Sequence, residues 1–106
     1  MLFRSQGHAV ALRELAQAYE IGTRGVSKDA GKAVFWYKKS AENGDSLAQY
    51  LTGTRYEHGN GVPKDVDQAI FWLRKAADHD RSDFAQNLAE KSLERLEKGR
   101  SSQQAR

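Results

Sequence analysis

The chain has 106 residues, of which 17 are Lys or Arg, 14 are Asp or Glu, and none is cysteine. Without cysteine it forms neither disulfides nor thiolate metal sites, and no stretch approaches the roughly 20 apolar residues of a membrane span. Lys98, Arg100 and Arg106 account for the net charge of +3, so the remaining sequence is neutral, which argues against a nucleic-acid partner.

The first expected element is a helix over about residues 8–21, because apolar residues such as Leu15 and Tyr19 recur at helical spacing. Residues 1–7, which precede it, are expected to be a partial repeat, the end of a preceding second helix. Gly22 ends the first helix, since glycine readily adopts the left-handed conformation found at such ends.

A second helix is expected to begin after Asp29, whose side chain suits an N-cap because it accepts hydrogen bonds from free backbone N–H groups. This helix runs to about Asn43, with Ala33 and Trp36 on its apolar stripe. No segment alternates with a period of two for long enough to predict a strand, so the predicted fold class is all-α.

The two helices and the loop between them recur along the chain. Residues 19–29 and 56–65 are near copies, and an alanine and a Phe-Trp pair follow each of them. The offset is 37 residues before the glycine loop and 36 after it. A period in this range is typical of an α/α superhelical solenoid of helix-turn-helix repeats. We therefore expect about five helices, with repeats at about residues 8–44 and 45–81.

The last helix, at about residues 82–98, is expected to cap the solenoid. Glu90 lies where the earlier first helices have alanine or glycine, and a carboxylate is costly to bury at such a position. No further helix is therefore expected over that face. Residues 99–106 are polar and without periodicity, so we predict a disordered tail after a repeat domain of residues 1–98.

These features resemble the motif of the Sel-one-like repeat family, a relative of the tetratricopeptide repeats. The motif combines alanines, a glycine-x-glycine-valine loop, an aspartate and a tryptophan, and the resemblance covers about residues 4–90. The second repeat matches it at Ala48, Gly53, Tyr56, Gly59, Gly61, Val62, Asp65, Ala69, Trp72, Ala76 and Ala77. The first repeat matches it at Tyr19, Gly22, Gly25, Val26, Asp29, Lys32, Ala33, Trp36, Tyr37 and Ala41.

The resemblance implies an adaptor, commonly bacterial, that acts in signalling and assembly. We therefore expect a non-catalytic protein–protein interaction scaffold whose partner is a protein or a peptide. A cysteine-rich subgroup of the family is associated with β-lactam binding, but its disulfides cannot form in this chain. Structural roles are expected for the packing aromatics, the loop glycines and the capping aspartates, which are Trp36, Trp72, Tyr19, Tyr56, Gly22, Gly59, Asp29 and Asp65.

Two other interpretations stay open. One is a fragment or subunit of a longer solenoid, which assembles into homo-oligomers by end-to-end stacking of incompletely capped ends. The other is an enzyme or small-molecule binder, which is less favoured. The Gly59–Gly61 loop lacks the lysine of a P-loop, and His8, His58 and His79 share no ligand spacing. No catalytic residue, metal site or cofactor is therefore predicted, and the absence of a signal peptide and of cysteine favours a cytoplasmic location over a secreted or periplasmic one.

The first candidate binding surface is the concave face of the first helices. Its residues recur at 37-residue steps, and the polar row is expected to contribute little to the core. The row comprises Arg13, Gln17, Tyr50, Thr54, Asn87 and Lys91. Tyr50 is its most promising member, since aromatic side chains are enriched at interface hot spots. Glu20, Glu57 and Glu94 are in register on the same helices.

The alternative surface is an outer patch formed by Phe35 and Phe71. At helical spacing both residues point away from the alanine–tryptophan stripe and lie among lysines and an arginine. Packing between neighbouring second helices is one explanation for them. The other is an aromatic and basic surface that receives a partner peptide or a second copy of the chain.

Overall fold

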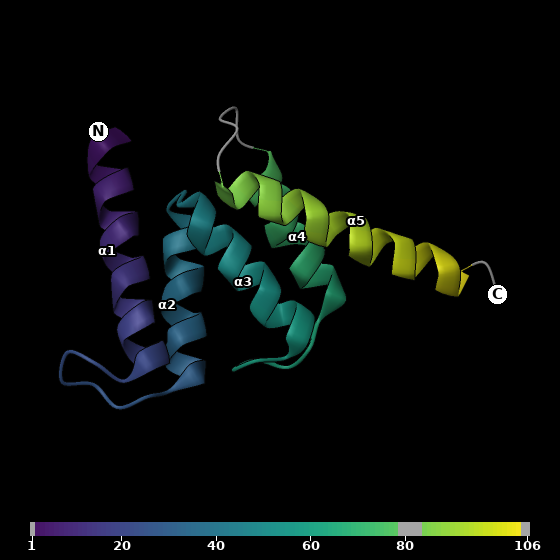
Figure 1. Ribbon diagram of the computed structural model, residues 1–106. Coiled ribbons are helices and arrows are strands. Elements are labelled where there is room, and N and C mark those ends of the chain that lie inside the picture. Colours follow the sequence, from purple (N-terminus) through teal and green to yellow (C-terminus); the bar gives the residue numbers. More distant parts are fainter. Residues whose placement is uncertain (1, 79–83, 105–106) are drawn as a thin grey trace.

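The computed structural model describes residues 2–78 and 84–104, with side chains over 8–78 and 84–99. Within the described ranges the chain forms α-helices and no strand (Figure 1). The helices are α1 (Leu2–Ile21), α2 (Ala30–Glu42), α3 (Ser46–His58), α4 (Val66–Ala77) and α5 (Phe84–Gln104). Each helix packs on the next, and α3 also contacts α5. This arrangement confirms the predicted all-α solenoid of five helices.

Aspartates cap the N-termini of the three helices in the middle of the chain. Asp29 Oδ1 accepts the Lys32 N–H at 3.0 Å, and Asp65 Oδ1 accepts the Gln68 N–H at 3.1 Å. Asp45, which sequence reasoning did not single out, caps α3 in the same way. The backbone N–H groups at the start of a helix have no partner within the helix, so each cap stabilises a defined first turn.

Both ends of the chain differ from expectation. α1 runs from Leu2 without a break, so residues 2–7 belong to the same helix as 8–21, and the predicted separate end of a second helix is wrong. A single glycine inside a helix costs only about 1 kcal/mol relative to alanine, so Gly7 does not end it. At the other end, the tail predicted to be disordered from Gly99 is helical to Gln104.

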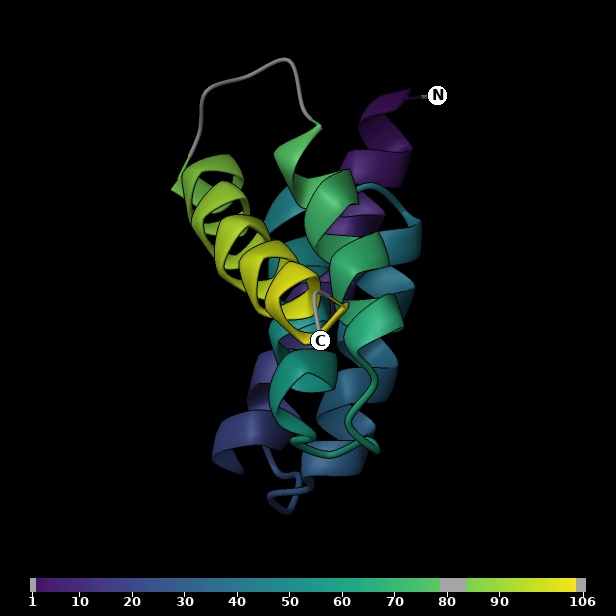
Figure 2. The ribbon, with the colours of Figure 1, turned by 90° about the vertical axis from the view of Figure 1, so that its right-hand side faces the viewer.

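The continuation of α5 has a local physical cause. Glu94 and Lys98 form an i,i+4 ion pair at 3.6 Å in the turn before Gly99, and Arg100, Gln103 and Gln104 after it are good helix formers. Glu90 is exposed, and the capping role of this helix stays a prediction. The predicted boundaries near residues 81 and 82 lie outside the described residues. Figure 2 shows α5 inclined across α3 and α4.

Small residues let the helices of each repeat approach closely. A cluster of Ala16, Ala33 and Tyr37 lies between α1 and α2, with Tyr19 and Trp36 packed against it. A second cluster, Ala41, Ala48 and Trp72, joins α2, α3 and α4 and therefore connects the two repeats. A Cβ atom placed on Gly53 would lie 2.7 Å from Leu73 Cγ, so only glycine fits between α3 and α4 here.

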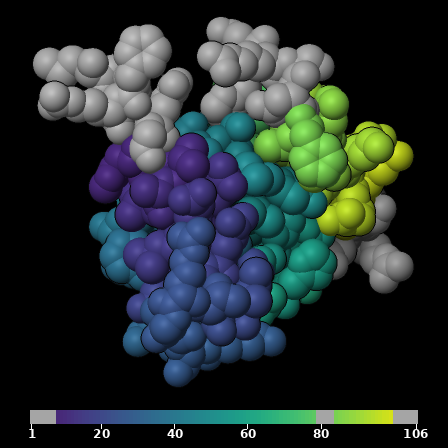
Figure 3. Space-filling view, turned by 60° about the vertical axis from the view of Figure 1, so that its left-hand side comes forward, coloured from purple at the N-terminus to yellow at the C-terminus, as the bar shows by residue number. Residues whose placement is uncertain are grey.

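The second glycine loop also connects the repeats. Gly61 has φ +83°, and a Cβ atom on it would lie 2.5 Å from the Ala30 carbonyl oxygen at the start of α2. Gly25, the equivalent residue of the first loop, has φ +80° and no atom of the described chain within 4 Å of such a Cβ. Figure 3 shows the side of the molecule where α1 and the loop after it, which contains Gly25, form the surface.

Candidate functional site

The concave row is partly used for internal contacts. Arg13 Nε lies 2.8 Å from Asp45 Oδ2, so this arginine pairs with the residue that caps α3. Thr54 Oγ1 donates to the Leu51 carbonyl oxygen at 2.8 Å, within its own helix. Both side chains therefore have partners inside the solenoid and are less available to a ligand than the sequence pattern predicts.

Tyr50 also differs from expectation. Its half-buried side chain packs against the core cluster of Ala69, Leu73, Ala76 and Ala89. The prediction that the row contributes little to the core is therefore wrong for Tyr50. Its aromatic ring covers the small alanine side chains of this cluster, which lie on α4 and α5. Gln17 is half-buried, whereas Asn87 and Lys91 are exposed. The concave face thus presents only part of the row to solvent.

The outer patch presents the same arrangement twice. Phe35 is 52% exposed and Phe71 is 50% exposed. Each ring meets the following tryptophan edge-on, with ring centroids 5.0 Å apart. A lysine Nζ lies over each phenylalanine, Lys39 at 5.6 Å from the Phe35 centroid and Lys75 at 5.3 Å from the Phe71 centroid. Each phenylalanine therefore packs against its tryptophan and a lysine while about half of the residue stays exposed.

A shallow depression of about 390 Å³ adjoins the second of these rings. It is lined by Asp67, Ile70, Phe71, Arg74, Lys75 and Asp78. All six residues belong to the outer side of α4 or to its C-cap. The outer patch therefore combines an aromatic face with charges of both signs.

A third site, at the junction of the repeats, was not predicted. Glu20 at the end of α1 accepts a hydrogen bond from the Tyr37 hydroxyl at 2.7 Å through Oε1, and Arg55 of α3 pairs with its Oε2. The Arg55 guanidinium also lies 5.5 Å from the centroid of the Tyr37 ring. Burial raises the pKa of Tyr37 to about 12, against a smaller opposing effect of the Arg13 charge, and burial lowers the pKa of Arg55.

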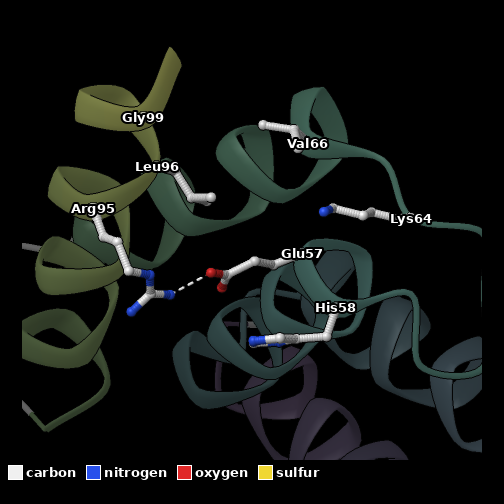
Figure 4. Close-up of a pocket in the computed structure, with 7 residues that line it drawn as sticks. All are labelled: Glu57, His58, Lys64, Val66, Arg95, Leu96 and Gly99. Atoms are coloured by element: carbon white, nitrogen blue, oxygen red, sulfur yellow. Dashed lines mark hydrogen bonds and ion pairs between the residues drawn. The ribbon is translucent and has the colours of Figure 1, made fainter. Parts of the chain in front are cut away.

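The next junction repeats the site with one partner missing. Glu57 of α3 is only 8% exposed, and its Oε2 pairs with Arg95 of α5 (Figure 4). Its Oε1 has no hydrogen-bond partner among the described residues. Leu73 lies at the position of Tyr37 and offers no hydroxyl. The surrounding pocket of about 310 Å³ is lined by Glu57, His58, Lys64, Val66, Arg95, Leu96 and Gly99.

The sequence contained one signal for these junction sites. Glu20 and Glu57 are 37 residues apart and therefore fall in one row of the repeat, but their arginine partners are out of register. Arg55 follows Glu20 by 35 residues, whereas Arg95 follows Glu57 by 38. A fixed period of 37 residues therefore aligns the two glutamates with each other but does not align their arginine partners.

The residues that the structure describes contain no group of three or more His, Asp or Glu side chains placed to hold a metal ion. Among them, no helix is both long enough and apolar enough to cross a membrane.

Several solved structures are similar to this chain. A Sel1 repeat protein from Oxalobacter formigenes aligns with a TM-score of 0.71 and 35% identity over 83% of this chain and 34% of its own. Helicobacter pylori cysteine rich protein B aligns with a TM-score of 0.64 and 30% identity, over 70% and 55% of the two chains. The present chain shares its fold but contains no cysteine.

A protective antigen of uropathogenic Escherichia coli strains, described as displaying an SLR fold, aligns with a TM-score of 0.64 and 41% identity. The alignment covers 72% of this chain and 16% of the antigen. The chain thus spans less than two thirds of the length of each of these three proteins. No curated protein sequence matches the chain at a significant level. The profile of the Sel1 repeat matches residues 9–45 and 46–80. As the motif residues predicted, the chain belongs to the Sel1 repeat family.

Proposed function

We propose that this chain is a non-catalytic scaffold that binds a protein partner through the outer patch of Phe35 and Phe71. Sel1 repeat proteins are generally scaffolds for protein interactions. The observation that supports this surface is the pair of phenylalanines, which are half exposed at equivalent positions of two successive repeats. An aromatic ring left in solvent at both positions offers apolar area that association with a partner would bury.

The environment of the rings suggests what the partner offers. Lys39 and Lys75 lie over the phenylalanines, and Asp67 and Asp78 line the depression beside Phe71. A segment with apolar side chains spaced to reach both repeats, flanked by charged groups, would complement this surface. The concave face is the less favoured alternative, since Arg13 and two other members of its row already have partners within the solenoid.

Affinity capture with matched variants tests the proposal. The wild-type chain, a Phe35→Ala/Phe71→Ala variant and an Asn87→Ala/Lys91→Ala variant are used to capture proteins from the source cells. We expect the phenylalanine variant to lose a partner that the wild type retains, by about 2 kcal/mol or more in affinity, and the concave variant to keep it. The opposite pattern would place the interface on the concave face.

A fold control accompanies the capture. Far-UV circular dichroism and thermal melting of both variants should resemble those of the wild type, because all four substituted side chains are exposed. An unrelated protein serves as the control bait. If the wild-type chain captured only proteins that this control bait also captures, the scaffold function itself would be contradicted.

A further inference from the structure

The two junction sites are built from equivalent parts. Each contains the last glutamate of a first helix, a lysine of the loop and the first residue of a second helix. In the first site these are Glu20, Lys28 and Ala30, and in the second they are Glu57, Lys64 and Val66. An arginine from the next first helix closes each site. Because the parts correspond, the first site is an internal reference for the second.

The reference shows that the second site lacks a hydrogen-bond donor. Both oxygens of Glu20 have partners, since the Tyr37 hydroxyl and Arg55 each donate to one. In the second site Arg95 donates to one oxygen of Glu57, and Leu73 leaves the other without a partner. The Glu57 side chain is 9% exposed, and an unpaired buried acceptor destabilises the folded state. This oxygen has almost no accessible surface, so a ligand that donates an N–H or O–H group to it has to displace the side chains that cover it.

The charges around the pocket restrict that ligand. Arg95 and Lys64 both line it, and Lys64 forms no ion pair with any described residue. With a single carboxylate against two cations, the pocket disfavours an amine and favours a ligand that also has a negative group. Figure 4 shows Arg95 reaching from α5 toward Glu57, with Lys64 on the opposite side of the same space. Val66 and Leu96 add an apolar wall.

The terminal residue of a peptide combines these features. Its amide N–H is a neutral donor, its carboxylate is an anion on the same residue, and its side chain can be apolar. A volume of about 310 Å³ is at the lower end of ligand pockets, which suits one or two residues better than a larger molecule.

We propose that the pocket between Glu57 and Arg95 binds the C-terminal residue of a peptide. The amide N–H of that residue donates to Glu57 Oε1, its carboxylate is held by Lys64 and Arg95, and its side chain lies against Val66 and Leu96. This site is separate from the outer patch, so either proposal can fail without the other.

The test uses an N-acetylated tripeptide that ends in leucine with a free carboxylate. It is titrated into the full ¹⁵N-labelled chain, and amide chemical shifts are followed by NMR. We expect saturable shift changes at Lys64, Val66 and Arg95. The same tripeptide with a C-terminal amide should bind at least about tenfold more weakly. An amidated tripeptide with an internal aspartate distinguishes a side-chain carboxylate from a terminal one, and its binding as tightly as the free acid would overturn the terminal assignment.

Three variants separate the parts of the proposal. Leu73→Tyr introduces the hydroxyl of the first site, so it should occupy Glu57 Oε1 and weaken binding at least about tenfold. Leu73 is fully buried and already packs on Gly53, so the larger ring has to shift neighbouring side chains in this variant. Lys64→Gln, an exposed substitution, should also weaken binding about tenfold, whereas Lys28→Gln at the matched site should not.

Several results would overturn this inference. They are the absence of saturable shifts with the free acid, equal affinities for the acid and the amide, or equal effects of Lys64→Gln and Lys28→Gln. The ¹H–¹⁵N spectrum of Leu73→Tyr reports directly whether that variant is folded. If it is not, Lys64→Gln and the acid–amide comparison decide the outcome.

Discussion

The contact between the second glycine loop and α2 leads to a sharp prediction about two equivalent glycines. Gly61→Ala should destabilise the protein much more than Gly25→Ala. Both residues have nearly the same positive φ, +83° and +80°, so both substitutions place a Cβ in the unfavourable left-handed region. Only the Cβ at position 61 meets neighbouring atoms, with the Ala30 carbonyl oxygen at 2.5 Å and a Val34 methyl at 3.1 Å.

The magnitudes follow from these two effects. A non-glycine residue in the left-handed region costs about 1–2 kcal/mol, and the loss of unfolded-state freedom on replacing glycine returns about 0.4–1 kcal/mol. Gly25→Ala should therefore cost about 1 kcal/mol. The clash at Gly61 involves backbone atoms of Ala30 that cannot rotate away, and overpacking of this kind adds about 1–3 kcal/mol. We expect a total of about 2–4 kcal/mol for Gly61→Ala.

Urea unfolding followed by far-UV circular dichroism measures both variants. Thermal melting gives a second estimate, since 1 kcal/mol shifts the Tm of a domain of this size by about 4–8 °C. Equal losses for the two substitutions would refute the reasoning, because backbone strain alone would then explain both. The second glycine loop would then not pack against the start of α2 in solution.

Two further predictions concern the polar contacts. Asp65→Asn should change the free energy of unfolding little, since asparagine also caps a helix. Asp45→Asn should lower it more, because Asp45 both caps α3 and pairs with Arg13. Urea unfolding of the two variants measures the difference. The folded-state pKa of Tyr37 is about 12 and the ordinary value is 10, so the unfolded chain loses its proton first and stability should fall as pH rises from 10 toward 12. Tyr37→Phe should flatten that part of the stability–pH curve, and an unchanged slope would show that Tyr37 does not cause it.

Much of the fold could be predicted because its determinants are local. Asp29 and Asp65 cap their helices through contacts three residues away, and glycine marks the ends of α1 and α3 by its left-handed conformation. The ends of the chain were harder to predict. Whether α1 passes through Gly7 depends on a balance of about 1 kcal/mol, which no sequence pattern resolves.

The candidate sites depend on contacts between repeats, which the period hides. Register groups the members of the concave row in the sequence, but it does not show that Tyr50 packs against the core or that Arg13 pairs with Asp45. Helical spacing left two alternatives for the outer phenylalanines, which were packing between neighbouring second helices and exposure as a binding surface. The unpaired oxygen of Glu57 results from a single difference, tyrosine in one repeat and leucine in the next, whose meaning appears only when the two sites are compared.

The unequal spacing of the Glu–Arg pairs also shows how such arrays tolerate variation in repeat length. Arg55 and Arg95 reach equivalent glutamates from positions about one helical turn apart on α3 and α5. The ion pair between successive first helices therefore does not need a constant spacing in the sequence. An insertion or deletion between two repeats can leave this contact intact if another turn of the next helix carries the arginine.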